Sequence, residues 1–89
     1  MHWLRSWESF VRIVETGSMA AAARRLDCTR AQISKQVADL EREFGVRLFE
    51  RSTRKLALTP SGEVFHQHAL RALDAISSTE IAVRNLGDT

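Results

Sequence analysis

The pattern of apolar and polar positions predicts three helices in the first half of the chain. Apolar side chains recur at helical intervals over residues 3–15, and four consecutive alanines lie within the stretch 19–26. A third stretch, 30–44, keeps its apolar residues on one helical face. The expected core stripe of the first helix is Trp3, Leu4, Trp7, Phe10, Val11 and Val14. The expected core row of the third helix is Ile33, Val37, Leu40 and Phe44.

Short-range signals mark where these helices begin and end. Gly17 can adopt the left-handed conformation that ends a helix, and Ser18 is a natural N-cap for the next one. Thr29 and Gln32 have the spacing of a capping box, in which each side chain binds the backbone N–H of the other residue. Gly45 is placed to end the third helix.

The pattern of residues in the second half of the chain predicts a hairpin followed by a long helix. Residues 46–59 contain two short apolar runs around a polar centre, a pattern that favours a small β-hairpin. Helical periodicity returns at Pro60, which suits the first helical position because no N–H is needed there. This pattern continues to about residue 86 and would span about 40 Å at about 1.5 Å per residue. The expected fold is therefore mainly α.

The long helix has an apolar row that a second helix can cover. With Thr79 between Ile76 and Val83, intervals of four and three residues separate its members, a spacing typical of helices that pair along their length. The rest of so small a domain covers only part of a helix of about 40 Å, so the far end needs another cover. A second copy of the chain is the simplest one. We therefore predict a homodimer contact through Phe65, Ala69, Ala72, Ile76, Val83 and Leu86.

The charge of the chain is small but unevenly distributed. The 89 residues have a net charge of +2. Residues 24–55 contain nine Lys and Arg against five Asp and Glu, whereas residues 56–89 contain two against four. A basic middle segment indicates a local anionic partner. No apolar run approaches the ~20 residues of a membrane span, and one cysteine excludes an internal disulfide. We expect one small domain, or a piece of a larger protein, that is cytoplasmic and has no membrane partner.

The outward face of the third helix has the composition of a DNA-reading surface. Small side chains and cations occupy it, and the acidic residues lie on its flanks. Small residues permit close approach to a groove, and cations donate to base edges and phosphates. A solvated helix face that happens to lack acids is the alternative interpretation. The residues of this face are Ala31, Ser34, Lys35, Ala38 and Arg42.

The second and third helices and the turn between them have the pattern of a helix-turn-helix motif. The helix N-termini at Ser18 and Thr29 suit phosphates, although both residues are also adequate caps without a ligand. The predicted hairpin contains Arg51, Arg54 and Lys55 with no acid among them. A basic hairpin beside such a motif is a wing that reaches the minor groove or the backbone. The alternative is a solvated, charged turn.

The residues do not indicate catalysis, metal binding or a cofactor. His66 and His68 point about 200° apart on a helix and cannot hold one metal ion together. The run that begins at Gly17 lacks the lysine of a phosphate-binding loop, and no nucleophile and base are paired. Cys28 is interpreted as a structural thiol, with redox sensing as the minor alternative. We expect a non-enzymatic chain without metal or cofactor.

Three segments together resemble the LysR-type transcriptional regulators. They are 10–26, 33–51 and 58–62, and the resemblance covers nearly the whole chain. It implies a winged helix-turn-helix, with three helices and a small β-hairpin wing, followed by a long linker helix that dimerises. Family members bind double-stranded DNA at palindromic operators near bacterial promoters, as homodimers that assemble into tetramers when full length. The same partners are therefore expected here.

The resemblance also assigns roles to individual positions. It implies base reading by Arg30, Ala31, Ser34 and Lys35. It implies backbone contacts by Ser18, Thr29, Arg51 and Thr53, and a wing contact near the minor groove by Arg54. The chain departs from the family at Thr29-Arg30-Ala31, where members often have Ser-Gln-Pro. Arginine suits guanine or a phosphate rather than adenine, so base preference at that step differs.

The expected organisation follows from the resemblance. The winged helix-turn-helix occupies residues 1–59, with the helix-turn-helix at about 18–44 and the wing at about 46–59. The linker helix occupies 60–86, and 87–89 begin a hinge. In the family this hinge leads to a separate effector-binding domain, so a small-molecule effector would act only through that domain. The leading function is sequence-specific DNA binding, and the alternative is a winged helix that binds a protein and no DNA.

Overall fold

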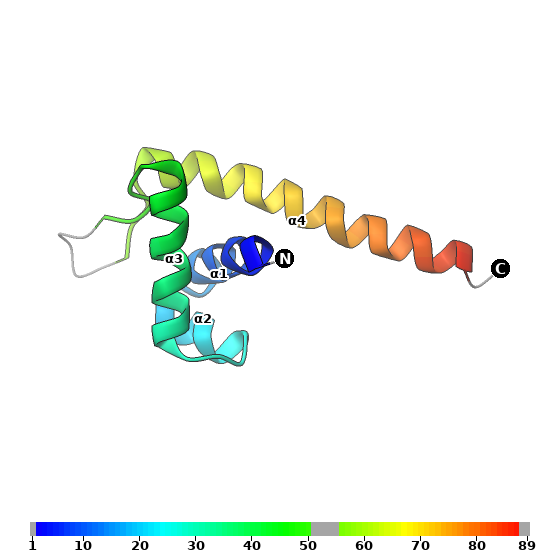
Figure 1. Ribbon diagram of the computed structural model, residues 1–89, viewed down its shortest axis with the longest axis horizontal. Coiled ribbons are helices and arrows are strands. Elements are labelled where there is room, and N and C mark those ends of the chain that lie inside the picture. Colours follow the sequence, from blue (N-terminus) through cyan, green and yellow to red (C-terminus); the bar gives the residue numbers. More distant parts are fainter. Residues whose placement is uncertain (1, 51–55, 88–89) are drawn as a thin grey trace.

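The computed structural model describes residues 2–50 and 56–87, which contain four helices. These are α1 (His2–Thr16), α2 (Met19–Arg25), α3 (Arg30–Phe44) and α4 (Pro60–Gly87). Figure 1 shows α1, α2 and α3 gathered in a bundle, while α4 runs away from it toward the C-terminus. The molecule measures 54 × 25 × 20 Å along its principal axes. The mainly helical fold is confirmed, and each predicted helix boundary agrees to within one residue.

The core of the bundle is built around Phe10 of α1, which is fully buried. Its ring centroid lies 5.1 Å from that of Phe49 and 4.9 Å from that of Phe65. Ile13 is also fully buried, although the predicted stripe omitted it, whereas Trp3 in that stripe is 49% exposed. The reason is tertiary, because α1 contacts α2, α3 and α4 and is covered from several sides.

The start of α2 and the turn after it are held by local interactions. Gly17 has a φ of +84°, as the helix-ending role requires. The Ser18 hydroxyl accepts a hydrogen bond from the Ala21 N–H at 3.0 Å, so the predicted N-cap is confirmed. In the turn between α2 and α3, Asp27 has a φ of 56°. Asp tolerates this left-handed conformation better than most residues, although the sequence pattern did not predict it at this position.

The ends of α3 agree with the predicted caps. The Thr29 hydroxyl accepts from the Gln32 N–H at 3.1 Å, and the Gln32 side chain accepts from the Thr29 N–H at 2.9 Å. Gly45 ends the helix with a φ of 66°. The apolar row is buried except at its last member, Phe44, which is 49% exposed. Phe44 still contacts Phe65 of α4, with ring centroids 5.4 Å apart.

The described part of the predicted hairpin is its base. Phe49 and Leu58 form one antiparallel bridge, and next to it the Thr59 N–H donates to the Leu48 carbonyl at 3.0 Å. Within the described residues this is a single bridge rather than a pair of strands. The predicted tip of the wing, 51–55, lies outside the described residues.

The long helix α4 begins where the sequence predicts. The Thr59 hydroxyl accepts from the Gly62 N–H at 3.0 Å and donates to the Arg47 carbonyl at 2.6 Å. Thr59 therefore caps α4 and also ties its start to the segment that follows α3. Although α4 has 28 residues, neither it nor another helix in the described residues is apolar enough to cross a membrane.

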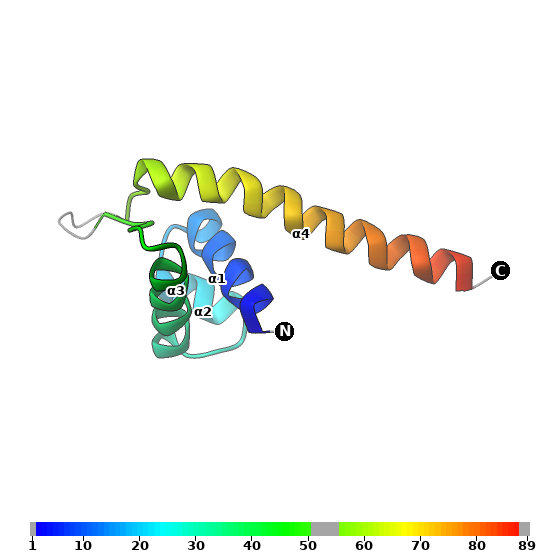
Figure 2. The same cartoon turned by 45° about the horizontal axis from the view of Figure 1, so that its top comes forward.

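The apolar row of α4 divides into a covered and an exposed part. Ala69 is fully buried in the core of the single chain, and the half-buried Phe65 packs against the same core. Figure 2 shows that the second half of α4 extends beyond the bundle. Val83 is 64% exposed and Leu86 78% exposed there. The first two members of the predicted dimer row thus pack within the single chain.

Candidate nucleic-acid interface

The first half of α3 exposes the side chains to which the resemblance assigns base reading, three of them on the outward face and Arg30 beside it. All four are exposed: Arg30, Ala31, Ser34 and Lys35. On the opposite face, Ile33 and Val37 are fully buried and Leu40 is 4% exposed. Burial of that apolar row prevents α3 from turning about its own axis. The exposed face therefore points away from the bundle as one unit.

Two of the predicted backbone-contacting residues lie at helix N-termini. Ser18 is half-buried at the start of α2, and Thr29 is exposed at the start of α3. Because each hydroxyl oxygen accepts from the backbone of its own helix, the hydroxyl proton is the group that it can donate to a phosphate. The other predicted wing and backbone residues lie outside the described residues: Arg51, Thr53 and Arg54.

The charges on α3 are more closely linked than helical period alone predicts. Asp39 lies on the flank of α3 by that period, but the Asp39 carboxylate reaches two cations of the outward face. One oxygen lies 3.1 Å from Lys35 Nζ and the other 3.1 Å from an Arg42 guanidinium nitrogen. The hydrogen bond from Lys35, aided by the charges of both partners, lowers the pKa of Asp39 below its ordinary 3.8. We call Lys35, Asp39 and Arg42 the ion-pair cluster.

A partly buried polar contact joins α3 to α1. The hydroxyl of Ser9, which is fully buried, donates to the side-chain oxygen of Gln36. Gln36 is adjacent in sequence to Lys35, so this contact anchors the middle of the candidate interface. This contact was not predicted from the sequence. The only signal was the presence of two serines, Ser6 and Ser9, three residues apart on an otherwise apolar side of α1.

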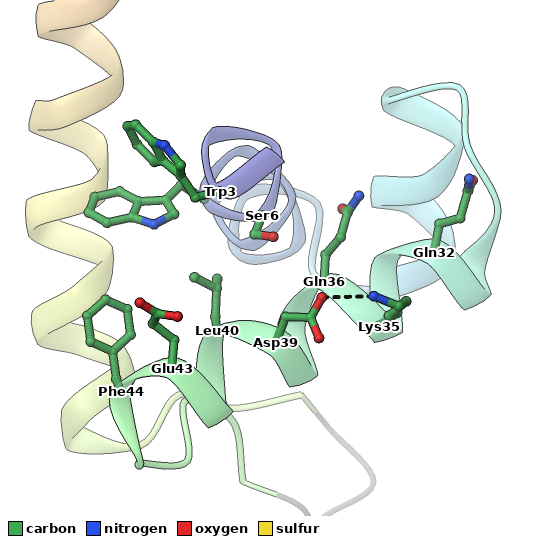
Figure 3. Close-up of a pocket in the computed structure, with 10 residues that line it drawn as sticks. Trp3, Ser6, Gln32, Lys35, Gln36, Asp39, Leu40, Glu43 and Phe44 are labelled. Atoms are coloured by element: carbon green, nitrogen blue, oxygen red, sulfur yellow. Dashed lines mark hydrogen bonds and ion pairs between the residues drawn. The ribbon is translucent and has the colours of Figure 1, made fainter. Parts of the chain in front are cut away.

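A groove of about 570 Å³ runs between α1 and the side of α3. Figure 3 shows Lys35 and Asp39 toward one end of it and Trp3 and Phe44 toward the other. A second groove of about 640 Å³ lies near the start of α4, and Phe44 lines it too. Trp7 and Phe44 line both grooves, and Phe44 is 49% exposed.

The exposed half of α4 offers a separate apolar surface. Ala72 and Ile76 are half-buried, and Ile81 is 54% exposed. Beyond the bundle, Val83 and Leu86 continue the same row with most of their surface exposed. A dimer contact through these residues stays a prediction.

No three His, Cys, Asp or Glu side chains come together as a metal ligand set within residues 2–50 and 56–87. The Nε2 atom of His66 is buried. The centroid of the His66 ring lies 6.3 Å from the centroid of the Phe10 ring. Cys28 is a half-buried free thiol in the turn between α2 and α3.

Sequence comparisons relate this chain to bacterial regulators. Residues 4–63 match the family described as bacterial regulatory helix-turn-helix protein, lysR family. An HTH-type transcriptional regulator of Xanthomonas campestris pv. campestris (strain 8004) is 39% identical over 85 residues, which are 96% of this chain and 25% of that protein. The HTH-type transcriptional activator AaeR of Escherichia coli (strain K12) is 40% identical over 76 residues, or 85% of this chain and 25% of that protein. The chain thus spans a quarter of the length of these relatives.

Solved structures with the same fold include complexes with DNA. The BenM DBD in complex with catB site 1 DNA superposes with a TM-score of 0.92 at 31% identity, covering 97% of this chain and 96% of that one. The CbnR DBD in complex with DNA gives a TM-score of 0.85 at 36% identity, covering 94% and 97%. The sequence match over 4–63 and these superpositions agree on one assignment. The chain belongs to the LysR family of bacterial helix-turn-helix regulatory proteins and has the fold of their DNA-binding domains.

Proposed function

We propose that this chain is the sequence-reading part of a bacterial transcriptional regulator, with α3 lying in the major groove of double-stranded DNA. The observation that carries this proposal is the exposed face of α3, in which small side chains alternate with cations above a buried apolar row. An α-helix fits the major groove of B-DNA, where each base pair presents a distinct pattern of donors and acceptors. A helix with short outward side chains approaches the base edges closely.

The four residues at the start of α3 differ in what they read. Arg30 can donate two hydrogen bonds to guanine O6 and N7, and Lys35 can donate to the same acceptors. Ser34 both donates and accepts, and Ala31 contacts only a thymine methyl group. The proposed site therefore prefers guanine at the two bases that Arg30 and Lys35 contact. It discriminates less among bases at the positions that Ala31 and Ser34 contact.

Phosphate contacts would hold α3 in register. Ser18 and Thr29 lie at helix N-termini, where backbone N–H groups and the helix dipole favour an anion. The wing residues Arg51, Thr53 and Arg54 would add contacts to the backbone and the minor groove. Arginine suits a narrow minor groove because the negative potential is stronger there.

A second copy of the chain would cover the exposed half of α4. Ile76, Val83 and Leu86 form an apolar row there that the bundle leaves open. A two-fold dimer repeats one contact patch on both subunits and presents two copies of α3. On a palindromic operator the half-sites would then lie about 34 Å apart, or a multiple of it. Full-length chains would associate further into tetramers.

The proposed organisation assigns 1–59 to DNA reading and 60–86 to the linker helix. The solved relatives include full-length CbnR in complex with its target DNA. A small-molecule effector would act through a domain that follows the linker, with 87–89 at the start of the hinge. The chain itself would need no cofactor and would carry no catalytic residue.

The proposal is tested by selecting duplexes from a randomised pool with the 89-residue chain. The dissociation constants for the selected duplex and for random duplex are then measured between about 50 and 200 mM salt, because phosphate contacts weaken as salt rises. Lys35→Ala is expected to reduce discrimination between the two duplexes by about 1–3 kcal/mol. Arg84→Ala, which removes the same charge near the far end of α4, is the matched control and should leave discrimination unchanged.

Two outcomes would contradict parts of the proposal. Equal weakening on both duplexes by Lys35→Ala would make Lys35 a phosphate contact. A chain that selects no sequence and shows no salt-dependent duplex binding would favour the alternative, a winged helix that binds a protein partner.

A further inference from the structure

The ion-pair cluster on α3 invites a functional explanation because it contributes little to stability. Lys35 and Arg42 each have about three quarters of the side chain exposed, at 76% and 74%. Ion pairs at such exposed positions add little to the free energy of unfolding. The cluster nevertheless lies on the face proposed to meet DNA, and one carboxylate serves both cations. The effect of the cluster is therefore on where the Lys35 and Arg42 side chains point and on what they can contact.

The geometry of the cluster places Asp39 between its partners along the helix axis. Lys35 precedes it by four residues and Arg42 follows it by three, so all three side chains lie along one stripe of α3. Each carboxylate oxygen holds one cation. Lys35 also follows the start of α3 by little more than one turn, which is the part of a recognition helix that meets base edges.

We infer that Asp39 is a positioning residue for sequence discrimination: it orients Lys35 toward a base and restrains Lys35 and Arg42 from contacting phosphates of any sequence. The inference rests on the proposed function of α3. A lysine on a flexible stem with no carboxylate nearby contacts whichever phosphate is close, and such contacts are independent of sequence. Asp39 accepts one of the three ammonium protons of Lys35, which leaves the other two for a base acceptor, whereas a phosphate in another direction has to compete with the carboxylate for the cation.

The test compares Asp39→Asn with wild type on the selected duplex and on random duplex. Asn keeps the size of the side chain and removes its charge. We expect binding to random duplex to strengthen about three- to tenfold at low salt, with a salt slope steeper by about one to two, as two additional phosphate contacts require. Affinity for the selected duplex should rise less. The affinity ratio, which is the affinity for the selected duplex divided by that for random duplex, should therefore fall.

Two further variants separate positioning from simple loss of charge. Glu43→Gln removes the same charge one helical turn further along α3, outside the ion-pair cluster, and should leave the affinity ratio unchanged. Asp39→Glu keeps the carboxylate and should restore most of the ratio. In a Lys35→Ala background, Asp39→Asn should change the ratio much less, because coupled residues are not additive. Circular dichroism melting checks that each variant is folded.

The outcomes distinguish this inference from the proposed function. A wild-type chain that selects no sequence would overturn both. A wild-type chain that selects a sequence, with an unchanged ratio in Asp39→Asn or an equal change in Glu43→Gln, would overturn only the role of Asp39.

Discussion

Gly62 of α4 lies directly against the backbone carbonyl of Leu48, at the base of the predicted wing. A Cβ atom on Gly62 would lie 2.1 Å from the Leu48 oxygen, far inside any normal contact distance. The same oxygen accepts the Thr59 N–H at 3.0 Å, so it has little freedom to move. Because Gly62 has no side chain, the start of α4 can lie directly against the Leu48 carbonyl. This close approach helps to set the direction in which α4 leaves the bundle.

Replacing Gly62 with Ala is expected to destabilise the chain. Alanine favours a helix over glycine by about 1 kcal/mol, but the new methyl group would overlap a hydrogen-bonded backbone carbonyl. We expect the overlap to dominate and to lower the free energy of unfolding by about 1–3 kcal/mol, as overpacking does elsewhere. Urea unfolding followed by circular dichroism measures the change.

Gly87→Ala is the matched control for this prediction. A Cβ at Gly87 meets nothing within 4 Å. The substitution should therefore leave stability within about 0.5 kcal/mol of the wild type. Equal effects from the two substitutions would show that the contact between Gly62 and Leu48 does not limit the packing of α4.

The carboxyl group of Asp39 should titrate below its ordinary pKa of 3.8, mainly because Lys35 donates a hydrogen bond to its charged form. A carboxyl whose pKa is lower in the folded chain stabilises folding above its unfolded pKa. That contribution is lost as the pH falls through the lower, folded value. Carboxyl chemical shifts from an NMR titration give the pKa directly. Replacing Lys35 and Arg42 by Met should return it toward 3.8; a value that does not move would show that the ion pairs do not form in solution.

Val83→Asp should weaken self-association of the chain. Val83 is 64% exposed on the free half of α4, and a charge there would be desolvated in the proposed dimer contact. Sedimentation equilibrium should give a dimer for the wild type and a lighter species for this variant. Ser78→Asp adds the same charge at an exposed position away from the apolar row and should remain dimeric. A monomeric wild type would reject α4 as a sufficient dimer contact.

The sequence alone determined the helices and their ends. Thr29 and Gln32 cap α3 through hydrogen bonds that span only three residues, and Gly17 and Gly45 end helices through their own backbone conformation. Such interactions are complete within a few positions of the chain, so spacing is enough to predict them. The exposed face of α3 was predictable for the same reason, because helical period places residues on faces before any packing occurs.

How the helices pack determines which of these surfaces are buried and which stay exposed. Ile13 is buried and Trp3 is half exposed in a helix that contacts α2, α3 and α4, and helical period alone does not show where those contacts fall. The contact of Ser9 with Gln36 joins residues 27 positions apart, and Ala69 of the predicted dimer row lies instead in the core of one chain. The pairing of Asp39 with both Lys35 and Arg42 depends on the conformation of their side chains, and helical period does not determine that conformation. Burial and side-chain pairing depend on distances through space, and these are set when the helices pack.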